Sequence, residues 1–169
     1  MKNSDNTLSL FLVDDDVMFL SALRHKIHEK FKSTLHISTF SDGEECLRHM
    51  DDKPDIVVLD YYLNHDFRHA MNGLEVLEKI KTVSEETQVL MLSSEEKQEV
   101  QDKSIRLGAY KYLSKNQLSS QNLQNAIKDV IHEIIIDRNA KENRQLNFIM
   151  GAVALAVVGL IIYLYYRYF

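Results

Sequence analysis

The chain has 169 residues, with five Gly, one Pro, one Cys, no Trp and a formal net charge of -5. A single cysteine excludes an internal disulfide and a cysteine-based metal cluster within one chain, and so few glycines and prolines exclude a collagen-like or low-complexity protein. The acidic balance argues against a nucleic-acid binder, which needs a basic face to neutralise phosphates. We therefore expect a folded domain with no nucleic acid among its partners.

Short apolar runs alternate with helical spacing between Leu8 and Ile136, a pattern typical of a sheet with helical crossovers. After the first, third and fifth runs, apolar residues recur every three or four positions, as on one face of a helix. Five strand and helix pairs in about 130 residues predict an α/β fold with an open, doubly wound parallel sheet. The predicted strands are Leu8 to Val13, Leu35 to Phe40, Ile56 to Leu59, Val89 to Leu92 and Tyr110 to Leu113.

The second helix is predicted from its start signal rather than from its length. Ser41 and Glu44 have the spacing of a capping box, in which each side chain bonds the other residue's backbone N–H. The apolar residues that follow include Cys46, which we expect to be a small core residue on the inward side of the helix.

The last segment is of a different kind. From Phe148 to Tyr166 there is no charged residue, and as a helix these nineteen residues would span about 28 Å, the thickness of a bilayer core. Ten of them are Leu, Ile, Val or Phe, which gives an insertion free energy on the order of -3 to -6 kcal/mol. The predicted organisation is a domain over residues 1–136, a polar juxtamembrane segment over 137–147 and a transmembrane helix over 148–166.

Basic residues flank the apolar segment unevenly. Arg138, Lys141 and Arg144 precede it and only Arg167 follows it, a bias that keeps the preceding part of a chain in the cytoplasm. No apolar run typical of a signal peptide precedes the first strand. We expect a single-pass protein of the cell inner membrane with its N-terminal domain in the cytoplasm. No Gly or Pro lies between Ser119 and Met150, and the sequence leaves open whether the fifth helix continues into the apolar segment.

Polar residues follow several of the predicted strands, at the edge of a parallel sheet where functional crevices lie. Each of them alone fits a helix cap or a surface charge, but together they indicate a site. Carboxylates that converge repel one another unless a cation is present, and hard oxygen ligands suit Mg²⁺. These residues are Asp14, Asp15 and Asp16 after the first strand, Asp60 after the third, Ser93 after the fourth and Lys115 after the fifth.

The same residues can serve phosphoryl transfer. If one carboxylate attacks a phosphoryl group, a metal ion, the Lys115 ammonium and the Ser93 hydroxyl can share the charge on the three equatorial oxygens. The pattern therefore predicts an aspartyl-phosphate site.

At these positions the sequence resembles the receiver domain of two-component response regulators, over Leu8 to about Ile136. The resemblance implies a flavodoxin-like five-stranded sheet of order 2-1-3-4-5. It rests on LFLVDDD (Leu10 to Asp16), PDIVVLD (Pro54 to Asp60), Gly73-Leu74 with EVLEKIK, VLMLSS (Val89 to Ser94) and LGAYKYLSK (Leu107 to Lys115).

By this resemblance the chain is a signalling module rather than an enzyme. It would receive a phosphoryl group from a histidine kinase or phosphotransfer protein, depend on Mg²⁺, and act on an output protein that the sequence does not identify. The implied roles are phosphoacceptor for Asp60, metal ligands for Asp14, Asp15, Asp60 and the Tyr62 carbonyl, switch hydroxyl for Ser93, switch aromatic for Tyr112 and phosphate partner for Lys115.

The sequence departs from the family pattern at three places. Leu63-Asn64 stand where the family usually has Met-Pro, Gly73 comes thirteen rather than eight residues after Asp60, and Asn116 replaces the proline that usually follows the lysine. The loop between Asp60 and Gly73 is therefore longer than the family's.

Other interpretations compete with this one. Asp14-Asp15-Asp16-Val17 also fits the DxDxV motif of haloacid-dehalogenase-type phosphatases, with Asp14 as nucleophile and Asp16 as acid or base, although the further acidic pair of that family is missing. A scaffold that keeps the fold without phosphorylation is a third possibility. His65 and His69, with Asp66 beside them, have metal-ligand spacing, but an exposed polar loop is the favoured interpretation.

Overall fold

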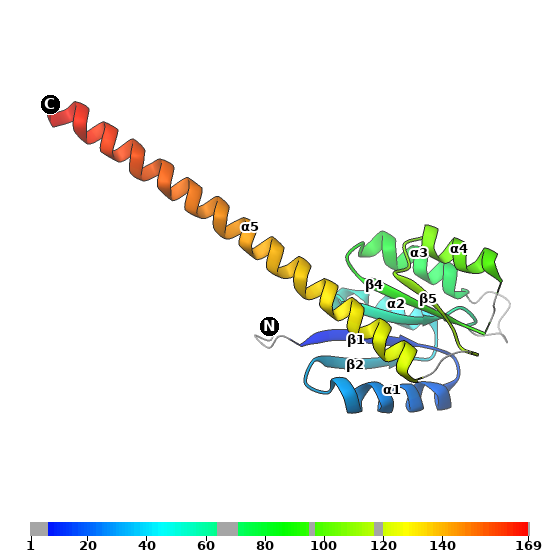
Figure 1. The fold of residues 1–169 in the computed structure, drawn as a ribbon. Helices are drawn as coiled ribbons and strands as arrows, with labels where there is room; N and C mark the ends of the chain where they lie inside the picture. The colour runs from blue at the N-terminus through cyan, green and yellow to red at the C-terminus, as the bar shows by residue number, and fades with distance from the viewer. Residues whose placement is uncertain (1–6, 64–70, 95–96, 117–119, 169) are drawn as a thin grey trace. The chain divides into compact units, whose positions relative to one another are not determined.

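The computed structural model describes residues 7–63, 71–94, 97–116 and 120–168 (Figure 1). The chain divides into two compact units, Met1–Ile131 and His132–Phe169, which we describe separately.

The first unit is built on a parallel sheet of five strands: β1 (Leu8–Val13), β2 (Leu35–Phe40), β3 (Ile56–Asp60), β4 (Gln88–Ser93) and β5 (Lys111–Ser114). Their order is β2-β1-β3-β4-β5 and every neighbouring pair is parallel, which confirms the predicted doubly wound, flavodoxin-like fold. β3, β4 and β5 each end one residue later than predicted, β4 also begins one residue earlier, and β5 begins one residue later. Asp60 pairs with Leu92 and Ser93 pairs with Ser114, so these two polar residues belong to the ladder itself.

Helices cover both faces of the sheet: α1 (Val17–Phe31), α2 (Gly43–Arg48), α3 (Gly73–Val83), α4 (Gln98–Arg106) and α5 (Ser120–Tyr168), with a 3₁₀ turn at Met50–Asp52. On one face α1 lies beside the first turns of α5, and α2 and α3 pack on the other (Figure 1). Successive side chains of each strand point in turn to the two faces of the sheet. Phe11, Val57 and Met91 face the α2 and α3 side.

The predicted capping box of the second helix is wrong. The N-cap of α2 is Asp42, whose Oδ1 accepts a hydrogen bond of 2.6 Å from the backbone N–H of Glu45, and Ser41 lies one position outside the helix. Glu44 is not at the third helical position and its Oε1 instead accepts from the Met71 N–H at 3.0 Å. Serine and aspartate are equally good N-caps, so local sequence alone did not decide between them.

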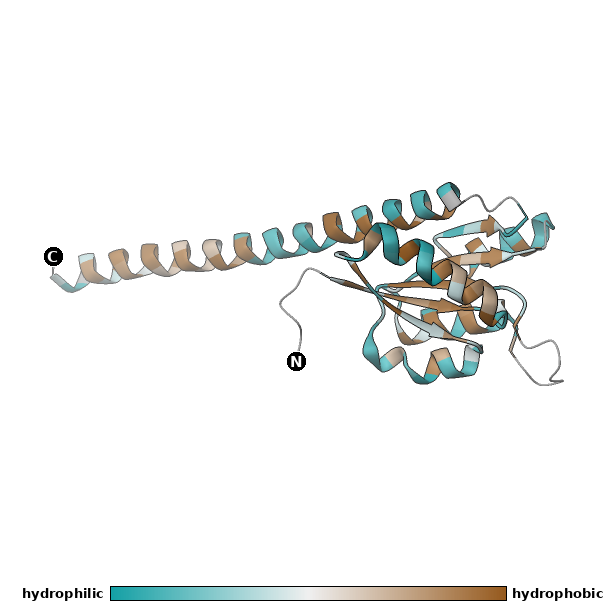
Figure 2. Cartoon of the chain, turned by 90° about the horizontal axis from the view of Figure 1, so that it is seen from below, coloured by the Kyte–Doolittle hydropathy of each residue, from teal (hydrophilic) through white to brown (hydrophobic). Residues whose placement is uncertain are grey.

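The second unit consists of the remainder of α5, which runs without interruption from Ser120 to Tyr168. By length and composition α5 is a helix that can cross a membrane. Figure 2 shows a polar stretch followed by apolar residues to near the C-terminus, and large apolar side chains there are exposed, among them Phe148 and Leu155 at 78% and 75%. A helix that is apolar on all sides and exposed is typical of a membrane span.

Candidate functional site

The predicted site residues lie at the carboxyl ends of neighbouring parallel strands. Asp14 follows β1, Asp60 ends β3 and Ser93 ends β4, and their exposed fractions are only 2%, 3% and 0%. Asp15, next to Asp14 in the chain, is exposed. The central strands β1 and β3 pair directly, so their ends bring the two buried carboxylates to one point.

Lys115 connects these carboxylates. Its Nζ lies 2.6 Å from Asp14 Oδ2 and 2.9 Å from Asp60 Oδ2. The backbone N–H of Lys115 donates to the Ser93 carbonyl at 2.6 Å, which ties the end of β5 to the end of β4. The second oxygen of Asp14 accepts from the Asp16 N–H at 3.0 Å. The structure thus brings together Asp14, Asp60, Ser93 and Lys115.

One ammonium does not offset the burial of two carboxylates. Burial raises the pKa of Asp60 to about 6, with the neighbouring Asp14 charge adding to the rise, although the hydrogen bond and charge of Lys115 oppose it. Burial likewise raises the pKa of Asp14 against the same lysine. Burial alone would lower the pKa of Lys115, but its hydrogen bonds and ion pairs with both carboxylates outweigh this and raise it.

The acidic cluster fits a hard cation. Asp14, Asp15 and Asp60 each offer a carboxylate oxygen, and these atoms lie within 4.8 Å of one another. Asp60 Oδ1 is buried and has no hydrogen-bond partner among the described residues. Carboxylate oxygens without nitrogen or sulfur ligands are a donor set that favours Mg²⁺ over softer metal ions. The residues present therefore fit both Mg²⁺ and an aspartyl phosphate.

Gly73 is required by the close approach of α3 to the end of β3. Its N–H donates to the Tyr61 carbonyl at 2.8 Å, and a Cβ at this position would overlap the Asp60 carbonyl oxygen. Asn72 and Glu75 form a capping box at the start of the same helix. The longer loop of this chain thus still returns to a glycine in contact with the backbone of Asp60.

The two tyrosines of the predicted site are both half-buried. Tyr62 follows β3, and its backbone N–H hydrogen-bonds Asp60, while its ring lies edge-on to Tyr61 at 4.6 Å. Tyr112 packs against the core on the α2 and α3 side. The metal role of the Tyr62 carbonyl and the switch role of Tyr112 remain predictions, and His65, Asp66 and His69 lie outside the described residues.

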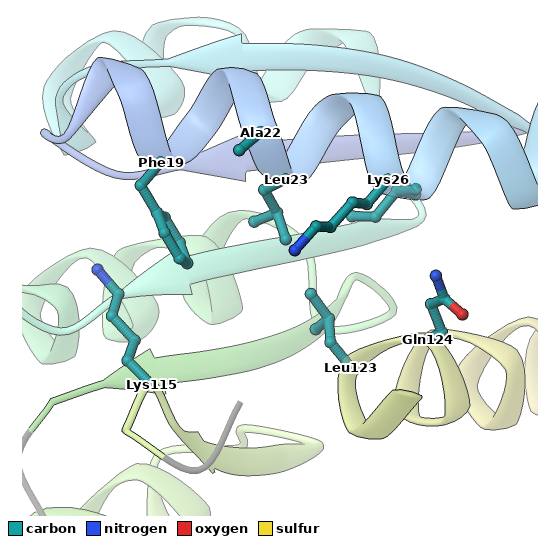
Figure 3. Close-up of a pocket in the computed structure, with 8 residues that line it drawn as sticks. Phe19, Ala22, Leu23, Lys26, Lys115, Leu123 and Gln124 are labelled. Carbon is teal, nitrogen blue, oxygen red and sulfur yellow. The ribbon is translucent and has the colours of Figure 1, made fainter. Parts of the chain in front are cut away.

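Two contacts at the site escaped the sequence analysis. Lys115 Nζ lies 4.7 Å from the centre of the Phe19 ring, a cation–π contact from the first turns of α1. Figure 3 shows both residues at one end of a pocket of about 130 Å³ between α1 and the start of α5. Asn116, which replaces the family's proline, donates from Nδ2 to the Ser94 carbonyl at 3.1 Å. Sequence gave no signal for either contact, since both depend on which loops the fold places side by side.

Asp16 has a structural role. Its Oδ1 accepts hydrogen bonds of 3.0 Å from the N–H groups of Met18 and Phe19 and so caps α1. The phosphatase alternative needs this carboxylate as an acid or base toward a substrate. The capping geometry counts against that alternative.

The fold and the site define a class: a doubly wound α/β domain with an acidic cluster and one lysine at the carboxyl edge of its sheet. The family described as "Response regulator receiver domain" matches residues 10–128. The chain belongs to this receiver family, whose members are signalling modules of two-component systems.

Solved structures agree with this assignment. A BeF₃-activated DrrB receiver domain is 28% identical, with a TM-score of 0.60 over 75% of this chain and 98% of that one. The signal receiver domain of a putative LuxO repressor protein from Vibrio parahaemolyticus is 17% identical, with a TM-score of 0.70 over 79% and 97% of the two chains. NtrX from Brucella abortus is 24% identical, with a TM-score of 0.70, covering 82% of this chain and 30% of its own. The last two similarities concern the fold alone.

Proposed function

We propose that this chain is a membrane-anchored receiver that takes a phosphoryl group onto Asp60 from the phosphohistidine of a histidine kinase or phosphotransfer protein. The observation that carries the proposal is the geometry around Asp60. Its Oδ2 is 2.9 Å from Lys115, its Oδ1 is buried without a hydrogen-bond partner among the described residues, and a second carboxylate shares the same lysine.

The proposed step exchanges one bond to phosphorus for another. A carboxylate oxygen of Asp60 attacks the phosphorus, the bond from phosphorus to the donor's imidazole nitrogen breaks, and the electron pair of that bond stays on the nitrogen. Ser93 ends β4, the strand beside β3, and Lys115 follows β5, with its Nζ 2.9 Å from Asp60 Oδ2. The Ser93 hydroxyl and the Lys115 ammonium would stabilise charge on the transferring oxygens. Asp60 must be ionised to attack, which its raised pKa of about 6 permits at neutral pH.

The proposed metal ligands are the carboxylates of Asp14, Asp15 and Asp60 and the backbone carbonyl of Tyr62. A bound Mg²⁺ would neutralise these carboxylates and the incoming phosphoryl oxygens. Lys115 alone bridges two buried carboxylates whose pKa values both stay raised, so the chain's own residues leave negative charge uncompensated.

The output of the phosphorylated state would be a change of partner binding. Ser93 is fully buried at the end of β4, and Tyr112 is half-buried on β5. Movement of the Ser93 hydroxyl toward the phosphate and reorientation of the Tyr112 ring would alter the surface near β5. The output partner is an unidentified protein. We infer that the chain accepts and passes on a signal rather than turning over a substrate.

We place the anchor in residues 148–166, after a receiver domain over residues 1–136 and a juxtamembrane segment over 137–147. The receiver would lie on the cytoplasmic side of the cell inner membrane, because basic residues concentrate before the span. Tethering raises the effective concentration of the receiver near a membrane-bound kinase.

Intact mass spectrometry of the full chain in a neutral detergent tests the phosphoacceptor. With Mg²⁺ and a small phosphodonor, the native chain should gain one phosphoryl group and Asp60→Asn none. Asp16→Asn is the matched control, since it also removes one carboxylate beside the site and should still be modified. Equal modification of the native chain and Asp60→Asn, or no modification at all, would favour the scaffold alternative.

The anchor is tested separately by membrane fractionation. The full chain should stay in the membrane fraction at high salt and be released by detergent. Leu155→Lys combined with Val158→Lys should release it, because two central lysines cost about 5 to 7 kcal/mol and the two lost apolar residues reduce the predicted gain to about 2 to 5 kcal/mol. Leu155→Ala with Val158→Ala is the control. A native chain that salt removes would refute the anchor without affecting the phosphoacceptor.

A further inference from the structure

A second group of ionisable side chains lies on α1 and the edge strand β2. Three of its members, Arg24, His28 and Lys32, recur every four residues and therefore share one stripe of the helix. Together with Thr7 and His36 they surround a hollow of about 250 Å³ whose remaining walls are Leu35 and Ile37. The hollow is therefore lined by both basic and apolar residues.

These basic groups lack acidic partners. No side chain of Arg24, His28, Lys32 or His36 forms a hydrogen bond or ion pair with a residue that the structure describes. From Arg24 to Lys32 the chain has four Lys or Arg, two His and a single acidic residue, Glu29, which lies 3.7 Å from His25. This concentration stands out in residues 1–136, where 23 acidic and 16 basic side chains give a net charge of -7.

Helix electrostatics explains only part of this cluster. The negative end of the helix dipole favours His28 and Lys32 in the last turn and beyond it, but its effect falls off within one turn. It does not account for Arg24 in the middle of α1 or for His36 on β2. Arg24 and Lys32 present two positive charges on one stripe without an acidic residue between them in that stripe, and an anion at the hollow would compensate both.

We propose that this hollow is a binding site for a phosphate-bearing anion. A carboxylate is satisfied by one arginine, whereas a phosphoryl group offers three acceptor oxygens and up to two charges to donors that approach from several sides. Arg24, His28 and Lys32 approach from α1, and the Thr7 hydroxyl adds a neutral donor from the residue before β1. The volume of the hollow and its apolar lining residues, Leu35 and Ile37, leave room for a small organic group attached to the phosphate.

The proposal is independent of phosphorylation. It uses no residue of the acidic site, and the phosphoacceptor assignment can fail without affecting it. The phosphate can come from a soluble ester or from a lipid headgroup, which present the same chemistry to the hollow.

Titration calorimetry of the full chain in neutral detergent tests it, with inorganic pyrophosphate as the probe and EDTA present to remove divalent cations. Removing two charges from the hollow with Arg24→Gln and Lys32→Gln should weaken binding at least about tenfold. The matched control is Lys26→Gln with Lys30→Gln. It removes an equal number of positive charges from the same helix, but outside the hollow, and should bind pyrophosphate like the native chain. His28→Gln, at the middle of the stripe, gives a further test and should weaken binding several-fold.

Absence of pyrophosphate binding to the native chain would overturn the proposal, as would equal losses in the two double variants, because the effect would then be one of net charge. A second arm identifies the source of the phosphate. The titration is repeated in nanodiscs of phosphatidylcholine with and without phosphatidylglycerol. Weaker pyrophosphate binding in the presence of phosphatidylglycerol indicates competition by headgroups in the hollow, and unchanged binding indicates a soluble ligand.

Discussion

Asp60→Asn should make the receiver domain more stable, although it removes one partner of the buried lysine. The reason is the raised pKa of Asp60, from the ordinary 3.8 to about 6, which burial causes despite Lys115. A carboxyl group whose pKa is higher in the folded state stabilises that state when protonated, and the advantage is lost as the pH rises through the folded pKa. At neutral pH the ionised group therefore opposes folding.

The magnitude follows from the shift. About 2.2 pKa units at about 1.36 kcal/mol per unit give about 3 kcal/mol. Asparagine has nearly the same shape and no charge. The free energy of unfolding of the variant should therefore exceed that of the native chain by about 3 kcal/mol at pH 7.5, by about half of this at pH 5 and by little at pH 4. No solvent discount applies, because only 3% of Asp60 is exposed.

The assay is denaturant unfolding of the full chain in neutral detergent with EDTA, followed by the tyrosine circular dichroism of the receiver. Saturating Mg²⁺ should then stabilise the native chain, by about 2.7 kcal/mol at a hundred times the dissociation constant, and so reduce the difference from Asp60→Asn. Asp15→Asn is the control: this exposed residue should leave the metal-free stability nearly unchanged but weaken the response to Mg²⁺. If Asp60→Asn is less stable than the native chain at pH 7.5, the ion pair outweighs the burial and the reasoning is refuted.

Three further predictions concern neighbouring positions, each measured by the same unfolding assay unless stated. Gly73→Ala should cost at least about 2 kcal/mol, because the new Cβ overlaps the Asp60 backbone, and an unchanged stability would contradict that contact. Lys115→Met should destabilise the domain by about 3 kcal/mol or more at pH 7.5 and by less at pH 5, where the two carboxylates take up protons; a loss independent of pH would argue against the shared ion pair. Cys46, whose pKa burial raises to about 12, should react with thiol reagents only at the rate at which the domain opens, and rapid labelling of the native chain would refute its burial.

Residue patterns were enough to predict the strands of the sheet, because strong local signals mark where most strands begin and end. The residues of β1 and β2 were predicted without error, since each apolar run ends at a polar residue or turn. β4 was predicted one residue short at its start and β5 one residue too early at its start, and β3, β4 and β5 were predicted one residue short at their carboxyl ends. There the ladder continues through Asp60 and Ser93, polar residues that hydrophobic patterning assigns to a loop.

The candidate site was predictable where it depends on topology and not where it depends on loop contacts. Parallel strands bring their carboxyl ends to one edge, so Asp14, Asp60 and Lys115 could be expected near one another. The cation–π contact of Lys115 with Phe19 and the bond from Asn116 to Ser94 depend on the packing of α1 and of two loops, for which one sequence carries no pattern.

The buried carboxylates of the site cost folding free energy, and the rest of the domain must compensate for that cost. An ionised Asp60 opposes folding by about 3 kcal/mol, a large fraction of the stability of an ordinary domain. Asp60 ends β3, the central strand, and Asp14 follows β1 beside it, and the residues of these two strands are nearly all buried, so the buried carboxylates lie in the core of the fold. Binding of Mg²⁺ beside Asp60 would relieve part of that cost only in the folded state. The chemistry proposed for the site and the stability of the domain are therefore linked, and a ligand that neutralises Asp60 must also stabilise β1 and β3.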